Sequence, residues 1–252
     1  YNLYKKMSKK NFLIFMPAYN VEKKILLFLK IIPKNIFNDN FITILIIDDC
    51  SKDNTKYIVE EYLKVSSDSN TFQLIKNEKR LGYGGVQKVA FRYAIKNNFD
   101  YVIMLHGDGQ YAPEKIPEFI DNLLNNNVDA VFGSRLINPR GALKGGMPIY
   151  KFIGNKVLTF VQNLILGSNM SEFHSGYRSY KISALKKINF EQNTNNFHFD
   201  SEIIIQMLKS NLVIKEIAIP TFYGDEVSHL KSVPYGINVL MSTIKYKFFY
   251  KD

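Results

Sequence analysis

The sequence has almost no cysteine and no apolar run long enough to cross a bilayer. Cys50 is the only cysteine among 252 residues, so neither an intrachain disulfide nor a cysteine-based zinc or iron–sulfur site can form. So little cysteine suits a reducing compartment, and we expect a cytoplasmic protein. The most apolar stretch, 149–166, contains two lysines and three amide side chains, whereas a membrane span needs roughly 18 to 20 apolar residues.

Other absences narrow the function. The lysines near the start lack the apolar region and the small-residue cleavage site of a signal peptide. No internal repeat of about 20 to 50 residues is visible. The net charge is +10, but the lysines are scattered and no RNA- or DNA-binding motif accompanies them. We therefore expect no nucleic-acid partner.

What is present is a globular composition in which short apolar runs alternate with longer amphipathic segments. The expected strands are 12–16, 42–47, 72–75, 101–105 and 130–132. The expected helices between them are 21–32, 54–64, 84–97 and 113–124. This order predicts an α/β fold with a mainly parallel central sheet flanked by helices. The second half departs from the alternation, with expected helices at 149–166 and near 201–210 and a strand near 213–219.

Polar clusters follow three of the expected strands. They are Pro17-Ala18-Tyr19-Asn20, Asp48-Asp49-Cys50-Ser51 and His106-Gly107-Asp108-Gly109-Gln110. Ligands of parallel sheets bind at the carboxyl ends of the strands, so these loops predict a binding site. Carboxylates at a strand tip, such as Asp48 and Asp49, can accept hydrogen bonds from a nucleobase or ribose. Helix capping explains Asp53 better than it explains these two.

Two further loops allow both a functional and a structural interpretation. Glycines 82, 84 and 85 open an expected helix, where they could bring free amide groups to an anion or simply permit close packing. Their spacing does not match the dinucleotide-binding fingerprint. His106, Asp108 and Gln110 alternate after a strand and could hold a divalent cation, although a metal-free glycine turn explains them equally well.

The order of these motifs resembles that of the family 2 glycosyltransferases. Asn77-x-x-Arg80-x-Gly82-x-Gly84-Gly85, Pro113-Glu114 and Gly133-Ser134-Arg135 complete the series, which extends over about 12–224. Within that family the chain resembles the polyprenyl-phosphate glycosyltransferases of the dolichol-phosphate mannosyltransferase type. The resemblance implies a GT-A fold, which is Rossmann-like, a GDP- or UDP-linked sugar donor, a divalent metal (Mn²⁺ or Mg²⁺) and inversion at the anomeric carbon.

The resemblance also implies roles for individual residues. Those matched to the nucleotide site are Pro17, Ala18, Tyr19, Glu22, Asp49, Asp53, Gly82 and Gly84. Asp108 matches the second carboxylate of the family's metal motif, and Gln110 matches a metal-side residue. His106 replaces the first carboxylate, and a neutral imidazole at this position favours manganese over magnesium and is lost as a ligand on protonation.

The acceptor side separates two kinds of enzyme. A phosphate monoester, with a second pKa of about 6, is already a nucleophilic anion and needs only cations to hold it, whereas a hydroxyl needs a general base. By resemblance, the acceptor cations are Arg135, Lys151 and Arg178. Asp200 and Glu202 resemble an acidic pair that could act as bases, but carboxylates are also favoured in the first turn of a helix.

These observations lead to one main hypothesis and two alternatives. The main hypothesis is metal-dependent transfer of a hexose to a polyprenyl phosphate at the inner face of the cytoplasmic membrane, during cell-envelope glycan assembly. The alternatives are transfer to a saccharide hydroxyl and a non-catalytic nucleotide-sugar binding protein. We expect a catalytic domain at 1–225 and an amphipathic segment at 226–252, with a lid near 221–229 and a helix that lies in the membrane interface or docks on the domain.

Overall fold

The computed structural model describes residues 9–65, 71–107, 111–223 and 232–248. Its strands are β1 (Asn11–Ala18), β2 (Phe41–Asp48), β3 (Phe72–Lys76), β4 (Tyr101–Met104), β5 (Ala130–Ser134), β6 (Arg178–Lys181) and β7 (Ile214–Ala218). Within the described ranges they form one sheet in the order β3-β2-β1-β4-β6-β5-β7. All neighbours are parallel except β6, which runs antiparallel to β4 and β5. The predicted α/β fold with a mainly parallel sheet is confirmed.

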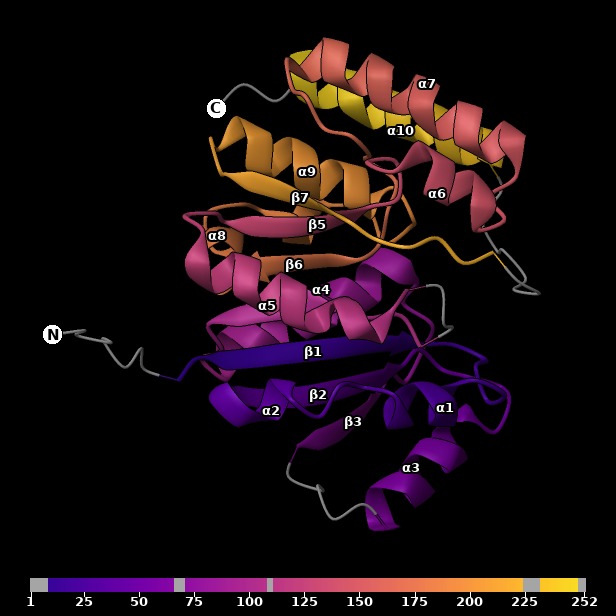
Figure 1. The fold of residues 1–252 in the computed structure, drawn as a ribbon, viewed down its shortest axis with the longest axis vertical. Coiled ribbons are helices and arrows are strands. Elements are labelled where there is room, and N and C mark those ends of the chain that lie inside the picture. The colour runs from indigo at the N-terminus through magenta and orange to yellow at the C-terminus, as the bar shows by residue number, and fades with distance from the viewer. Residues whose placement is uncertain (1–8, 66–70, 108–110, 224–231, 249–252) are drawn as a thin grey trace, which may run out of the picture.

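Helices cover both faces of this sheet (Figure 1). They are α1 (Ile25–Lys30), α2 (Ile36–Asp39), α3 (Thr55–Val65), α4 (Tyr83–Lys96), α5 (Ile116–Asn125), α6 (Pro139–Lys144), α7 (Ile149–Leu166), α8 (Ile182–Leu185), α9 (Phe199–Lys209) and α10 (Ser232–Phe248). Two short 3₁₀ turns, η1 (Pro113–Lys115) and η2 (Phe190–Gln192), complete the described elements. In the part of the chain that is described, no helix is long and apolar enough to cross a membrane.

The alternation of side chains along β1 explains the two layers of helices. Phe12 and Ile14 enter a core shared with α1, α3 and α5, whereas Leu13 and Phe15 enter a second core shared with α4, α8 and α9. Because both faces are buried, the strand is apolar at nearly every position, as is typical of parallel sheets. The two cores hold the sheet rigid beneath the loops at its carboxyl edge.

The C-terminal helix docks on the domain. α10 packs beside α7 and against α9, at the end of the molecule opposite β3 and α3 (Figure 1). One side of α10 thus packs on the domain, while the expected lid falls mostly on residues 224–231, outside the described residues.

Candidate active site at the carboxyl edge of the sheet

The loops expected to form the site meet at one edge of the sheet. β1 ends at Ala18 and the parallel strand β2 ends at Asp48, while His106 follows β4, which is also parallel to β1. β5 ends at Ser134 and points the same way as β4, because both run antiparallel to β6. The clusters expected after β1 and β2, and the described residues His106 and Gly107 after β4, therefore lie at one edge of the sheet.

The loops after β1 and β2 are locked together by backbone-to-side-chain hydrogen bonds. The amide of Asn20 donates to Ser51 Oγ (3.0 Å), and that of Glu22 donates to Asp53 Oδ2 (3.1 Å). In return, the amide of Asn54 donates to Glu22 Oε2 (2.9 Å). Glu22 and Asp53 thus shape the loops after β1 and β2, and each uses a carboxylate oxygen to do so.

Asp49 organises the glycine loop. Its carboxylate accepts from Asn77 Nδ2 (2.9 Å) and from the amides of Leu81 (2.8 Å) and Gly82 (2.9 Å). Asp48 is equally buried, and its Oδ2 has no hydrogen-bond partner among the described residues. An unpaired buried carboxylate oxygen is costly, so Asp48 offers the better acceptor for a ligand hydroxyl or amide. The sequence singled out the pair, but only the structure separates the two roles.

The glycines of this loop are required by packing. Gly84 donates its amide to the Asn195 carbonyl (2.8 Å), and a Cβ at Gly84 would overlap the Thr194 carbonyl and approach Phe199 Cβ to 2.8 Å. Gly82 has a φ of +80°, which side-chain-bearing residues rarely adopt. Because the amides of Gly82 and Gly84 already have protein acceptors, the structure supports the structural interpretation over free amides for an anion.

Arg80 lies beside the loop after β1, and the sequence assigned it no role of its own. Its guanidinium carbon lies 3.8 Å from the centroid of the Tyr19 ring, and the side chain is exposed. Stacking of this kind holds a planar cation at a fixed place while its N–H groups stay available. The available signal was its position inside the Asn77-to-Gly85 motif.

Only part of the cluster that is expected to bind a metal is described. Asp108 and Gln110 lie outside the described residues, which contain no group of three or more potential metal ligands. His106 is described: its Nε2 is buried beside Gly176 without a hydrogen-bond partner, and its ring lies 5.7 Å from that of Tyr83 and 5.0 Å from that of Tyr111. An orphaned ring nitrogen in this position fits a histidine that has a ligand to bind.

At the end of β5, Arg135 is held by the buried carboxylate of Glu172. Its amide and Nε donate to the two oxygens of Glu172 (2.7 and 3.0 Å), and its Nη2 donates to the His174 carbonyl (3.0 Å). Burial lowers the pKa of Arg135, but the charge of Glu172 outweighs this and the net pKa is raised. The guanidinium is therefore a permanent cation with 12% of the side chain still exposed.

A second cation stands close to the first. Arg135 Nη1 is 3.5 Å from the hydroxyl of Tyr223, and Lys151 Nζ lies 5.0 Å from the centroid of the same ring. Two of the three expected acceptor cations, Arg135 and Lys151, therefore flank one tyrosine. We call these three residues the acceptor cluster, after the role that the resemblance implies for its two cations.

Arg178 does not join the acceptor cluster. Its guanidinium is 1% exposed and donates to the carbonyls of Ser175, Phe173 and Asp200, each at 2.7 Å. All three guanidinium nitrogens therefore have protein acceptors, and the group ties the 173–175 segment to the first turn of α9. The expectation that Arg178 meets a phosphate is not supported by this position, because nothing of its charge reaches the surface.

The two expected general bases also have hydrogen-bond donors within the protein. Asp200 accepts from Tyr83 Oη (2.7 Å) and Gln87 Nε2 (3.0 Å). Glu202 accepts from the amide of Thr194 (2.6 Å) and from Ser242 Oγ (3.1 Å). Both carboxylates lie in the first turn of α9, as the helix-terminus interpretation predicts, and both are buried.

His174 is a residue that the sequence did not flag. Its Nδ1 shares a hydrogen bond with the hydroxyl of Tyr235 on α10 (2.9 Å). Burial, with the charges of Arg135 and Arg178, lowers its pKa to about 3, so the ring is neutral near pH 7. Its only sequence signal is adjacency to the Ser175-to-Arg178 motif.

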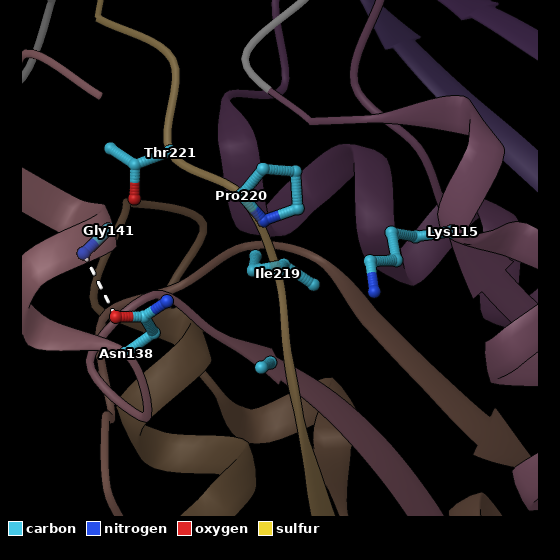
Figure 2. Close-up of a pocket in the computed structure, with 7 residues that line it drawn as sticks. Lys115, Asn138, Gly141, Ile219, Pro220 and Thr221 are labelled. Atoms are coloured by element: carbon cyan, nitrogen blue, oxygen red, sulfur yellow. Dashed lines mark hydrogen bonds between the residues drawn. The ribbon is translucent and has the colours of Figure 1, made fainter. Parts of the chain in front are cut away.

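A pocket of about 400 Å³ opens beside the acceptor side. Figure 2 shows Lys115 and Asn138 on opposite sides of the Ile219–Pro220 segment, with Thr221 beyond. Asn138 caps α6 by accepting from the amide of Gly141 (3.0 Å). Two residues after this segment the chain reaches Tyr223 of the acceptor cluster, which does not itself line the pocket.

The chain matches known proteins in sequence and in fold. The model of glycosyl transferase family 2 matches residues 13–189. Over 254 residues the chain is 32% identical to the UDP-N-acetylglucosamine--dolichyl-phosphate N-acetylglucosaminyltransferase of Methanococcus voltae, covering 97% of this chain and 96% of that protein.

Solved structures of glucosyl-3-phosphoglycerate synthase from Mycobacterium tuberculosis share the fold. The complex with uridine diphosphate gives a TM-score of 0.70 at 12% identity, covering 98% of this chain and 84% of that one. The complex with Mn²⁺, uridine diphosphate and glucosyl-3-phosphoglycerate gives 0.68 at 13% identity, with 98% and 83% covered. The predicted GT-A fold is thereby confirmed. The family match and the curated relative show that this chain is a glycosyltransferase that belongs to glycosyl transferase family 2.

Proposed function

We propose that this enzyme transfers a hexose from a UDP-linked donor to a polyprenyl phosphate, with inversion at the anomeric carbon. The observation that carries the proposal is the acceptor cluster, in which Arg135 and Lys151 flank Tyr223. Both candidate bases, Asp200 and Glu202, are buried and already hydrogen-bonded. A phosphate acceptor needs cations to hold it and no general base, whereas a hydroxyl acceptor needs a general base to remove its proton.

The choice of donor and acceptor is supported by relatives. The Methanococcus voltae relative is named for transfer from UDP-N-acetylglucosamine to dolichyl phosphate, and the structural neighbour binds uridine diphosphate. We therefore favour UDP over GDP and take N-acetylglucosamine as the first sugar to test. A polyprenyl phosphate acceptor would place the enzyme at a membrane surface, on the inner face of the cytoplasmic membrane.

The proposed reaction is a single displacement. A phosphate oxygen of the acceptor, held by Arg135 and Lys151, forms a bond to the anomeric carbon. The bond from that carbon to the diphosphate oxygen breaks on the opposite face, and the nucleoside diphosphate leaves with the electron pair. No proton has to be removed from the nucleophile, because the acceptor is already anionic near neutral pH.

The donor is proposed to bind over the carboxyl ends of β1 and β2. Pro17, Ala18 and Tyr19 line this edge, and the free oxygen of Asp48 and the Arg80 guanidinium offer it an acceptor and a cation. Asp49, Asp53, Glu22, Gly82 and Gly84 act through the loops that they shape.

A divalent cation is proposed to bind beside His106, with Asp108 and Gln110 as its other ligands. When bound, it would neutralise charge on the diphosphate leaving group. The orphaned Nε2 of His106 supports a ligand at this position. Because imidazole brings no negative charge, we expect manganese to support activity better than magnesium.

The test is release of nucleoside diphosphate from a panel of UDP- and GDP-sugars, with Mn²⁺ or Mg²⁺ and with or without a short water-soluble polyprenyl phosphate. We expect release that depends on the lipid phosphate and is greatest with a UDP-sugar. Arg135→Gln should abolish the lipid-dependent release, and Lys151→Gln checks this result at a position less tied to the core. Release stimulated by a saccharide instead, and lost in Asp200→Asn, would show a hydroxyl acceptor. Donor binding without turnover for any acceptor would show a binding protein.

A further inference from the structure

Helix α7 exposes its apolar side to solvent and turns polar residues towards the domain. Its outward residues are apolar, at spacings of three and four that keep them on one side of the helix: Ile149, Ile153, Val157, Phe160 and Leu164, which are 55–74% exposed. Its buried residues are polar, since Thr159 and Gln162 face the domain. A helix that packs on a soluble domain normally shows the opposite arrangement.

α10 repeats the inversion. Val233, Ile237, Met241 and Ile244 are 45–74% exposed and again recur at spacings of three and four. Towards the domain, Ser242 Oγ donates to Glu202 on α9 (3.1 Å), and Thr243 is fully buried. Polar contacts therefore help to attach the helix beside the buried Val239, and the four residues of the apolar stripe are left outside.

The two apolar stripes lie on neighbouring helices that run in the same direction. Gly236 packs beside Leu158, and one or two turns later Gln162 Nε2 donates to Thr243 Oγ1 (3.3 Å). The pair forms one layer at the end of the molecule (Figure 1). Such a concentration of exposed apolar side chains on one element pair marks an interaction surface. We call it the α7–α10 face.

The charge of these helices identifies the partner. Residues 149–166 and 232–248 contain four lysines, Lys151, Lys156, Lys245 and Lys247, and no aspartate or glutamate. Two such faces from separate copies would bring like charges together, whereas an anionic lipid surface is complementary to them. Lysines beside apolar residues can also extend to the headgroups while their stems stay in the apolar layer.

We propose that the α7–α10 face lies in the interface of an anionic lipid bilayer, with its apolar stripes at the boundary between headgroups and acyl chains. This inference rests on the proposed function, because it explains how a water-exposed site meets a lipid-linked phosphate. Lys151 of the acceptor cluster is in the first turn of α7, and Tyr235 in the first turn of α10 binds His174. The leading ends of both helices thus lie beside the acceptor cluster, so a bilayer on this face would present a lipid phosphate there.

The experiment is flotation of the full chain with phosphatidylcholine vesicles, with and without phosphatidylglycerol. The test variant combines Phe160→Ser and Leu164→Ser. The matched control combines Leu27→Ser on α1 and Tyr57→Ser on α3, which are 59% and 63% exposed on the other end of the molecule. Wild type and control should bind anionic vesicles, and the test variant should bind at least about tenfold more weakly.

Three results would overturn the inference. The first is wild-type protein that does not float with anionic vesicles, and the second is a test variant that binds them like wild type. The third is a wild-type dimer, seen in sedimentation equilibrium, that is lost in the test variant, because this would assign the face to a second copy of the chain. Turnover of a short water-soluble polyprenyl phosphate keeps the two proposals apart. The test variant should retain it, whereas its absence in wild type would contradict the proposed function and leave the vesicle result standing.

Discussion

The two ends of the sheet satisfy their charged groups in opposite ways. At the β1–β2 end, the carboxylates of Asp49 and Asp53 accept from backbone amides of neighbouring loops. At the β5–β6 end, the guanidinium groups of Arg135 and Arg178 donate to backbone carbonyls and to the buried Glu172. The β1–β2 end therefore uses carboxylates to hold its loops, whereas the β5–β6 end uses guanidinium groups; under the proposed function, the first would need a cation to receive a diphosphate and the second already carries cations.

The largest effect is expected from Arg178→Ala, which removes the guanidinium at the centre of the acceptor end. Three buried carbonyls would lose their donor and Asp200 would lose the charge 3.9 Å away. We expect about 3–5 kcal/mol less free energy of unfolding, measured by urea titration. Arg92→Ala, which breaks an exposed ion pair with Glu191, is the control and should cost under about 1 kcal/mol. An Arg178→Ala protein that is as stable as wild type but binds the acceptor weakly would instead show that Arg178 contacts the acceptor.

The next effect concerns the glycine loop at the donor end. Gly84→Ala would force a methyl group against Thr194 and Phe199, so we expect a loss of about 1–3 kcal/mol in the free energy of unfolding. Gly154 in α7 has open space around its Cα, and Gly154→Ala should instead stabilise by about 0.5–1 kcal/mol. Equal effects at both positions, measured by denaturant titration, would contradict the close approach of residues 194–199 to the loop.

A kinetic difference is expected from Lys151→Gln. Loss of one of the two cations of the acceptor cluster should raise the KM for the lipid phosphate about tenfold and leave the KM for the nucleotide sugar unchanged. Lys156→Gln, one to two turns further along α7, is the control and should leave both constants unchanged with a soluble acceptor. A rise in the donor KM alone would move Lys151 to the donor end.

The smallest effect is a pH dependence caused by His174 at the acceptor end. Its folded pKa of about 3 lies below the ordinary histidine value of 6.5, so between these two values the unfolded chain binds a proton that the folded chain does not. The contribution of His174 to the free energy of unfolding is therefore fully present above about pH 6.5. Below that pH it falls by about 1.4 kcal/mol for each pH unit, until the folded group also titrates. His174→Gln should lose less free energy of unfolding between pH 7.5 and 5.5 than wild type does. An identical loss in both proteins would show that His174 titrates normally.

The sequence predicted the parallel half of the fold well, because each strand there is a buried apolar run between amphipathic helices. It missed β6, since Arg178–Lys181 is a short segment of polar and aromatic residues that becomes a buried strand only between β4 and β5. It also placed the first helix at 21–32, whereas α1 spans Ile25–Lys30. The earlier residues are used in hydrogen bonds to the loop after β2, which no local pattern reveals.

The site shows the same division. Motif order located the strand-end loops and the family, and it included Arg135, Lys151 and the Asp48–Asp49 pair. It could not separate Asp48 from Asp49, or Arg135 from Arg178, because these differences depend on which buried partner each group meets. The sequence assigned His174 and Arg80 no role for the same reason, since their partners lie on distant segments.

By itself the sequence determined the α/β layers, the family and the edge of the sheet where the family motifs gather, because periodicity and motif order are local properties of the chain. Only the tertiary structure decided which charges are available to a ligand and which are consumed inside the protein. It also decided that the apolar stripes of α7 and α10 face outwards, since an amphipathic sequence defines two sides of a helix but not which side the domain will cover. Long-range packing makes that choice.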